Sequence, residues 1–327
     1  MMASIIDVAK KAGVGIATVS RVINDSGYVK KETRERVESV IAEIGYVPNE
    51  IARSMTLQKN NIVAFILPNS THLFFGELLF FVEEELFNYG YKMMVCNSSM
   101  KKEKDIAYID LLKKNRVDSI ILLTNNDVEP YLDKRLPIVS FDRTFDGVSF
   151  VSSDNYTGGV MAAQHLIKKG CKKMMFIGDD AQGIHTNVQT EVSKRRIGFF
   201  DELAKHGITN IINVEYPLGN YTYIPDYVHQ IIHSHPEVDG IFCISDAVAA
   251  EVVLNLEKRG LNVPKDVKVI GFDGARSFLN LGKRLTSIGQ SPKLIAAAIA
   301  EIITNLYENR TVKNIIVPVY LQEGDTT

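Results

Sequence analysis

The 327-residue sequence predicts a small all-helical head followed by a larger α/β core. Within the first 45 residues, apolar side chains recur at helical spacing in three short segments separated by glycine-bearing turns. From residue 62 onward, short runs rich in β-branched and aromatic residues alternate with amphipathic segments of helix length. Such alternation is typical of parallel βαβ units.

The composition is that of an ordinary globular protein, with 46% hydrophobic and 23% charged residues, and the length suits two or three folding units. The start lacks a basic stretch followed by a long apolar region, and no apolar run approaches the ~18 residues of a membrane span. We therefore expect a cytoplasmic protein with no membrane partner. Cys96, Cys171 and Cys243 are widely separated and predict buried free thiols.

Two short helices open the chain. Ser4 and Asp7 have the spacing of a capping box, and Gly13 and Gly15 flank the turn that follows. The apolar positions are Ile5, Val8, Ala9 and Ala12 in the first helix and Val19, Val22 and Ile23 in the second. Two helices joined by such a turn predict a helix-turn-helix unit. A third helix is predicted by the apolar positions Val37, Val40, Ile41 and Ile44, and Gly45 marks its end.

The outer face of the second helix suggests a function, because three helices alone could form a plain bundle. With the apolar stripe turned inward, this face exposes Ile16, Ala17, Thr18, Ser20 and Arg21. A recognition helix contacts base edges with this part of its surface. Arg21 suits a bidentate contact to guanine, whereas Ile16 and Ala17 offer only apolar contacts. Residues 1–60 hold nine Lys or Arg against seven Asp or Glu, an excess too small to indicate DNA by itself.

Ordered motifs in the head resemble one known family: DVAKKAGV at 7–14, ATVSRVIN at 17–24, TRERV at 33–37 and GYVPN at 45–49. They are similar to the DNA-binding head of the LacI/GalR family of bacterial regulators. The resemblance implies that Ile16, Ala17 and Arg21 read the operator. It also implies contacts to the DNA backbone from Thr18, Ser20, Asn24, Tyr28 and Asn49. Gly15 and Lys30 depart from the family, because each stands where a hydroxyl usually caps a helix. Glycine remains an acceptable cap, whereas the missing cap at Lys30 costs about 1 kcal/mol.

Residues 49–60 predict a hinge, because Asn49 can cap a two-turn helix that is marginal in isolation. In the LacI/GalR family this segment folds in the minor groove, where paired leucines wedge into the central base step. The resemblance places Ala52 and Met55 on the DNA here, with Met55 as the wedge. A linker whose Met55 packs on the core is the alternative. The predicted domains are a helix-turn-helix domain at 1–48, a hinge at 49–60 and a core at 61–327.

The core contains seven predicted buried strands: Ile62–Leu67, Tyr91–Cys96, Ser119–Leu123, Pro137–Phe141, Lys173–Ile177, Gly240–Ile244 and Val267–Phe272. Its predicted helices are Gly76–Tyr89, Lys102–Asn115, Tyr156–Lys169, Asp246–Arg259 and Pro292–Glu308. Ligands of such folds bind beyond the carboxyl ends of the strands, so the residues that follow strands are the candidates for a binding site.

The core lacks the usual anchors of nucleotide-binding and hydrolytic sites. No GxGxxG follows the first strand, and neither GxxxxGK[ST] nor GxSxG occurs. His229, His233 and His235 could place two imidazoles on one helical face, but no acidic or cysteine partner accompanies them, which is typical of surface histidines. We therefore expect no enzymatic activity, no cofactor and no metal.

The core also resembles the LacI/GalR family, whose effector-binding region is built like periplasmic sugar-binding proteins. The resemblance implies two α/β lobes with a ligand between them. The effector-binding residues it implies are Phe74, Phe75, Asp142, Arg195, Tyr221, Ser245 and Asp273. Arg195 and Asp273 would grip sugar hydroxyls by charge-assisted hydrogen bonds, or would form a structural ion pair instead. Ser245 stands where the family usually has Asn, which implies a bulkier or differently placed effector.

The function expected from the sequence is a transcriptional regulator, a repressor of a carbohydrate-utilisation operon controlled by a sugar or sugar phosphate. A homodimer would bind a near-palindromic operator, because two recognition helices meet successive major-groove faces. The last seven residues are too few for a tetramerising coiled coil. A cytoplasmic sugar-binding protein without a regulatory role would not use residues 1–60. A sugar-modifying enzyme would need a base or nucleophile, which the sequence does not reveal.

Overall fold

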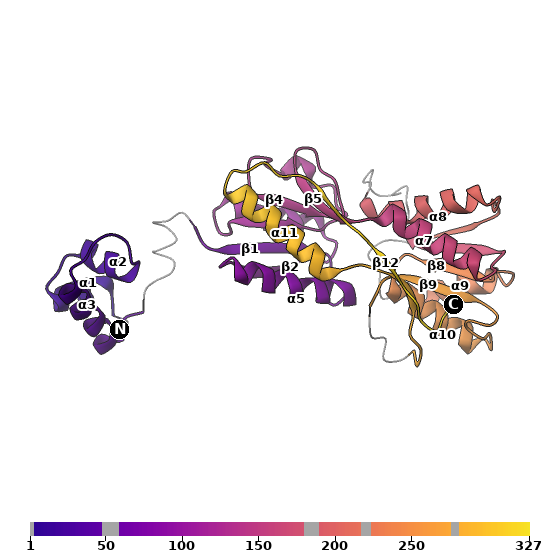
Figure 1. Ribbon diagram of the computed structural model, residues 1–327, viewed down its shortest axis with the longest axis horizontal. Coiled ribbons are helices and arrows are strands. Elements are labelled where there is room, and N and C mark those ends of the chain that lie inside the picture. The colour runs from indigo at the N-terminus through magenta and orange to yellow at the C-terminus, as the bar shows by residue number, and fades with distance from the viewer. Residues whose placement is uncertain (1–2, 48–58, 180–189, 217–223, 276–280) are drawn as a thin grey trace. The chain divides into compact units, whose positions relative to one another are not determined.

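The computed structural model describes residues 3–47, 59–179, 190–216, 224–275 and 281–327. The chain divides into two compact units, Met1–Asn60 and Asn61–Thr327. Figure 1 shows the first unit as a cluster of helices and the second as two sheets covered by helices. The predicted all-helical head and α/β core are therefore confirmed. Within the described ranges, no helix has the length and apolar character needed to cross a bilayer.

The head consists of α1 (Ile5–Ala12), α2 (Ile16–Ile23) and α3 (Lys31–Ile44). The predicted capping box starts α1, because the Asp7 N–H donates to Ser4 Oγ (3.3 Å) and the Ser4 N–H donates to Asp7 Oδ2 (2.9 Å). Gly13 and Gly45 end α1 and α3 with left-handed backbones. The core is made by the predicted apolar stripes: Val8, Ala9, Ala12, Val19, Val22, Val37 and Val40.

The first lobe of the core is a six-stranded parallel sheet in the order β11-β5-β4-β3-β1-β2. Its strands are β1 (Ile62–Leu67), β2 (Lys92–Asn97), β3 (Ser119–Leu122), β4 (Ile138–Phe141), β5 (Ser149–Ser153) and β11 (Ile315–Val317). Its helices are α5 (Leu73–Asn88), α6 (Lys102–Lys113) and α11 (Pro292–Tyr307). Buried side chains of α5 and α11 share one hydrophobic cluster, and those of α6 belong to another. The two faces of the sheet are thus covered separately.

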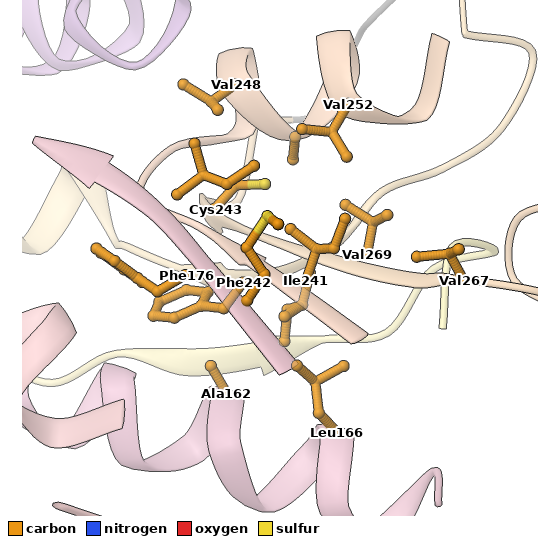
Figure 2. Close-up of a cluster of buried hydrophobic side chains, with 14 of the residues drawn as sticks. Ala162, Leu166, Phe176, Ile241, Phe242, Cys243, Val248, Val252, Val267 and Val269 are labelled. Atoms are coloured by element: carbon orange, nitrogen blue, oxygen red, sulfur yellow. The ribbon is translucent and has the colours of Figure 1, made fainter. Parts of the chain in front are cut away.

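The second lobe is a six-stranded sheet in the order β12-β10-β9-β8-β6-β7, in which only the β10–β12 pair is antiparallel. Its strands are β6 (Met174–Asp179), β7 (Ile212–Tyr216), β8 (Gly240–Cys243), β9 (Lys268–Asp273), β10 (Thr286–Gly289) and β12 (Tyr320–Gln322). Its helices are α7 (Asn155–Lys168), α8 (Lys194–Lys205), α9 (Ile224–Ser234) and α10 (Asp246–Lys258). Figure 2 shows Ala162 and Leu166 of α7 against one face and Val248 and Val252 of α10 against the other.

The chain passes between the lobes three times. The passes run from β5 to α7, from β10 to α11 and from β11 to β12. Figure 1 shows these connections as the links between the two sheets. Because three segments join the lobes, any change in the relative orientation of the lobes must be absorbed by backbone changes in the few residues of these segments.

The predicted strands and helices are confirmed, with ends shifted by up to three residues. The elements not expected from the sequence are β5, β7, β10, β11, β12, α8 and α9. Two of these strands carry small polar residues rather than an apolar run: Ser152 and Ser153 of β5 and Thr286 and Ser287 of β10 are all buried. Hydrophobic periodicity cannot detect a buried strand of this kind.

Helices α7 and α8 approach so closely that their backbones touch at two glycines. A Cβ atom on Gly159 would lie 2.0 Å from the Arg195 carbonyl oxygen, and one on Gly198 would lie 2.1 Å from the Tyr156 carbonyl oxygen. Glycine is therefore required at both positions for this helix pair to form.

We expect Gly159→Ala to separate α7 from α8 and to lower the free energy of unfolding by about 1–3 kcal/mol, the usual cost of overpacking. Urea denaturation of the full chain measures this change. Gly76→Ala is the matched control, since a Cβ there would meet only the Ser70 carbonyl oxygen at 3.8 Å. Equal stability of the two variants would contradict the close helix contact.

Candidate DNA-reading face and effector site

The outer face of α2 carries the residues expected to read DNA. Ile16 is 48% exposed and Ala17 and Arg21 are also exposed, while Val19 and Val22 face the core of the head. The predicted orientation of the helix is therefore the one observed. No side chain caps the first turn of α2 or of α3, as expected from Gly15 and Lys30 at their N-caps.

The residues expected to contact the DNA backbone lie in different surroundings. Thr18 and Ser20 are half-buried, and Tyr28 is 86% exposed. The Asn24 side-chain amide donates to the Ser20 carbonyl oxygen (2.9 Å) and to Ser20 Oγ (3.2 Å), so it closes the end of α2. This amide therefore has an internal structural role. The hinge residues expected on the DNA, Asn49, Ala52 and Met55, lie outside the described residues.

Arg195, the second residue of α8, is the centre of the polar site in the core. Its side chain is buried, and its Nε donates to Asn155 Oδ1 (2.7 Å). Its Nη1 donates to the Ile244 carbonyl oxygen (2.7 Å) and lies 3.8 Å from Asp273 Oδ1. The guanidinium carbon lies 3.6 Å from the centre of the Phe272 ring. Hydrogen bonds, an ion pair and a ring contact together fix the orientation of this guanidinium.

Asp273 is the last residue of β9, and its φ of 119° is one that side-chain-bearing residues rarely adopt. Its Oδ1 accepts from Gln290 Nε2 (2.8 Å), and its carbonyl oxygen accepts from the Gln290 N–H (3.1 Å). Gln290 Oε1 in turn accepts from Ser153 Oγ (2.5 Å). Ser153 ends β5 and Gln290 follows β10, so this chain of bonds joins two of the passes between the lobes.

Asp142 directly follows β4 in the first lobe and has a left-handed backbone, with φ 53°. Its Oδ1 accepts from Ser152 Oγ (2.7 Å) and from Asn155 Nδ2 (3.4 Å). Burial raises the pKa of Asp142, and the charge of Arg195 opposes that rise. Asn155 therefore links a carboxylate of the first lobe to the arginine of the second.

Ser245 and Asp246 follow β8 and begin α10. Ser245 Oγ accepts from the Val248 N–H (3.4 Å), so the hydroxyl caps the helix. Asp246 is fully buried, and its Oδ2 accepts from the Ala275 N–H (2.7 Å). Burial, and then the nearby charge of Asp273, raise the pKa of Asp246 well above its ordinary value of 3.8. Two acidic groups thus share this end of the sheet.

The aromatic candidates separate into a core residue and a surface residue. Phe74 is buried and stacks on Phe141, with ring centres 6.4 Å apart, so it belongs to the core of the first lobe. Phe75 is partly exposed and lies against the His72 ring at 4.7 Å. Tyr221 lies outside the described residues.

The structure therefore brings Asp142, Arg195 and Asp273 into one hydrogen-bonded network, with Ser245 at the adjacent strand end. Asn155 and Gln290 belong to this network and were missed by the sequence analysis. Both follow strands that lack an apolar run, so the strand ends that would have marked them were not recognised. Together these groups present carboxylate acceptors and amide and guanidinium donors, which are the groups that bind hydroxyls.

The buried Asp246 carboxyl predicts a pH dependence of stability. Because the native pKa of Asp246 is above 3.8, the protonated carboxyl stabilises the fold fully below about pH 3.8. This stabilisation is lost as the pH rises through the native pKa. The loss is about 1.4 kcal/mol for each pH unit by which the native pKa exceeds the unfolded one. The Asp246→Asn variant does not lose stability in this way, because asparagine does not ionise. Its side-chain oxygen can still accept from the Ala275 N–H. We expect the unfolding free energy of wild type to fall relative to Asp246→Asn between about pH 4 and 7, measured by urea denaturation. A constant difference across this range would contradict the raised pKa.

Comparison with known proteins identifies the family. Residues 4–49 match the family described as "Bacterial regulatory proteins, lacI family", and residues 60–323 match "Periplasmic binding proteins and sugar binding domain of LacI family". The sucrose operon repressor of Streptococcus mutans is 34% identical over 331 residues, which cover 100% of both chains. The ribose operon repressor of Bacillus subtilis is 35% identical over 273 residues, covering 83% of this chain and 82% of that one.

Among solved structures, the Lac repressor dimer bound to operator and the anti-inducer ONPF has the same fold, with a TM-score of 0.86 and 20% identity over 100% of this chain and 99% of that one. The predicted helix-turn-helix head and two-lobed core built like periplasmic binding proteins are confirmed. The family consists of transcriptional regulators rather than enzymes. Because both family descriptions match and together span nearly the whole chain, this protein belongs to the LacI family of bacterial regulators and is a DNA-binding transcriptional regulator.

Proposed function

We propose that this regulator represses a carbohydrate-utilisation operon in the cytoplasm and that a sugar bound between its lobes sets its affinity for the operator. The observation that carries the proposal is the Arg195 network, in which donors and acceptors from both lobes meet at strand ends. The names of two relatives, the sucrose and ribose operon repressors, support the ligand class. The sugar-bound and sugar-free forms of the protein would then differ in the relative orientation of the two lobes.

The charges around Arg195 favour a neutral sugar over a sugar phosphate. Its Nη1 lies 3.8 Å from Asp273 Oδ1, so a carboxylate already offsets its positive charge. Asp142 adds a second buried carboxyl on the side of the first lobe. A dianionic phosphate placed here would face both carboxyl groups, whereas hydroxyls can donate to them. Phe75 offers a ring for the apolar face of a sugar, and Ser245 takes less room than the asparagine usual in the family.

The proposed DNA contacts follow from the exposure of α2. Arg21 contacts guanine in the major groove, and Ile16 and Ala17 make apolar contacts beside it. The proposed backbone contacts come from Thr18, Ser20, Asn24, Tyr28 and Asn49. Ala52 and Met55 complete the proposed site in the minor groove, with Met55 as the wedge at the operator centre.

A homodimer is proposed because α5 and the edge strand β2 of the first lobe both expose large apolar side chains. Leu73, Phe80 and Phe87 of α5 are 49%, 60% and 69% exposed, and their seven-residue spacing places them on one side of the helix. Met94 and Val95 are exposed on β2, the adjacent edge strand of the sheet. Large apolar side chains exposed together on one helix face are typical of a protein interface. Pairing of two such surfaces would present two heads to a near-palindromic operator.

The effector site is tested by Arg195→Ala. A panel that includes sucrose and D-ribose first identifies the sugar that binds wild type in titration calorimetry. We expect Arg195→Ala to weaken that sugar about 10- to 100-fold, the effect of lost charge-assisted hydrogen bonds, in protein that circular dichroism shows to be folded. Arg196→Gln, at the neighbouring half-buried arginine, is the control. Sugar affinity that survives Arg195→Ala would exclude this site.

The DNA-reading face is tested by Arg21→Ala with an operator selected from random DNA by gel shift. We expect specific affinity to fall about 5- to 150-fold, equivalent to about 1–3 kcal/mol, because a bidentate base contact is lost. Lys11→Ala is the control, because it removes one positive charge from the head at a site where Glu43 already offsets that charge (Nζ–Oε1 2.6 Å). We expect little change in its operator affinity. Equal losses in both variants would indicate a general electrostatic effect instead of base reading.

The dimer surface is tested by replacing Phe80 and Phe87 with Glu and measuring mass by sedimentation equilibrium. We expect a shift from dimer to monomer at micromolar concentration, because pairing would bury four carboxylates without partners. Ile316→Glu is the control, since Ile316 is 48% exposed on β11 at the opposite edge of the same sheet. Dimers that persist in the double variant would place the interface elsewhere.

A further inference from the structure

Asn61 is the first residue of the core and directly follows the proposed hinge at 49–60. Its backbone is left-handed, with φ 57°, so the chain turns as it enters β1. On one side of β1, the Asn61 carbonyl oxygen accepts from the Lys92 N–H of β2 (2.7 Å). On the other side, Asp118 directly precedes β3, and its N–H donates to the Ile62 carbonyl oxygen (2.8 Å). Both neighbouring strands therefore hold the chain where it enters the core.

The side chain of Asp118 adds a second hold on the same turn. Its Oδ2 accepts from the N–H groups of Asn61 (2.5 Å) and Ile62 (3.3 Å). Successive N–H groups that converge on one oxygen form an anion-binding turn, and hydrogen bonds to a charged acceptor are among the stronger ones. Asp118, Asn61 and Ile62 together form what we call the entry anchor.

The Asp118 carboxylate is enclosed by two aromatic residues. Asp118 is buried, and the rings of Tyr91, directly before β2, and Tyr307, the last residue of α11, lie 5.8 Å apart. Burial, and then the charge of Asp118, raise the pKa of Tyr307 to about 12 and also raise the pKa of Tyr91. The carboxylate therefore lies near both rings. Because water is largely excluded from Asp118, it competes little for the hydrogen bonds of the entry anchor.

The entry anchor lies one strand away from the proposed dimer surface. The edge strand β2, which exposes Met94 and Val95, pairs with β1 along its whole length. Neighbouring strands lie about 4.8 Å apart. In a homodimer that forms through this edge, the two copies of Asn61 are therefore held at one fixed separation.

We infer that Asp118 is a positioning residue for operator binding, because it fixes where and in which direction each chain leaves the core. The inference rests on the proposed homodimer. Met55, the proposed wedge at the operator centre, precedes Asn61 by only six residues, so the entry anchor acts close to the DNA. One added base pair moves a half-site by about 3.4 Å and rotates it by about 35°, since a turn of about 10–10.5 base pairs spans about 34–36 Å. A held chain does not follow this change, whereas a released chain does.

The inference is tested by the spacing of half-sites that the full-length protein prefers. Duplexes carry two half-sites of the selected operator at the selected spacing, or with one base pair added or removed, and fluorescence anisotropy measures each Kd. We expect wild type to bind the selected spacing at least about tenfold more tightly than the altered ones, because linked heads gain affinity only when both engage. Asp118→Ala is expected to reduce this preference to less than about threefold.

Three further variants separate positioning from stability. Asp118→Asn keeps an oxygen that accepts from Asn61 and Ile62, so it should retain most of the preference. Asn61→Val breaks the turn at an exposed residue, because a β-branched residue rarely adopts this backbone, and should act like Asp118→Ala. It decides the question if Asp118→Ala does not fold. Ser99→Val is the matched control, since Ser99 is exposed and left-handed (φ 55°) just beyond the carboxyl end of β2.

An unchanged spacing preference in folded Asp118→Ala, or in Asn61→Val, would overturn the inference. An equal loss in Ser99→Val would also overturn it, because it would indicate a general loss of stability. Affinity for a duplex with one half-site is expected to be the same in every variant, and a lower value in Asp118→Ala would place the effect in the head. Wild type that binds all spacings equally would contradict the homodimer and the inference together.

Discussion

Burying the guanidinium of Arg195 requires acceptors for its N–H groups and a carboxylate near its charge, since an unpaired buried cation is strongly unfavourable. Asn155 Oδ1 and the Ile244 carbonyl oxygen accept from it, Asp273 lies 3.8 Å away, and the Phe272 ring lies against its plane. These partners come from α7, the end of β8 and the end of β9. One side chain on α8 therefore fixes the relative positions of three other elements, and the glycine contacts between α7 and α8 bring it close enough to do so.

The same requirement connects the two lobes. The Asn155 amide that accepts from Arg195 also donates to Asp142 of the first lobe, and Gln290 joins Asp273 to Ser153 at the end of β5. These bonds lie at the connecting segments where the relative orientation of the lobes can change. Sugar hydroxyls that replace some of them would alter the preferred arrangement of the lobes. A coupling of 1–3 kcal/mol, which changes operator affinity roughly 5- to 150-fold, is within the range of such rearrangements.

The sequence predicted the longest apolar runs, and the strands that it did not predict include two, β5 and β10, with buried serines and threonines. The stripes of α1 to α3 follow helical periodicity, and β1, β4 and β9 are apolar runs, so Asp142 and Asp273 could be placed at strand ends. The buried hydroxyls of β5 and β10 bond to Asp142, Gln290, the Gly274 N–H and Thr327. Because these strands lack an apolar run, their ends, with Asn155 and Gln290, were not found. The burial of Phe74 depends on packing against Phe141, which sequence spacing cannot reveal. The roles of Ser245 and Asn24 as helix-end hydrogen-bonding groups likewise depend on local geometry.

Control of operator binding by a ligand between the lobes is tested most directly by thermodynamic linkage. The affinity of wild-type protein for its sugar is measured by calorimetry with and without saturating operator, and operator affinity is measured with and without saturating sugar. Coupled sites predict that both ratios are equal and differ from one, by roughly 5- to 150-fold. A sugar affinity that is the same for free and operator-bound protein would contradict the proposed control.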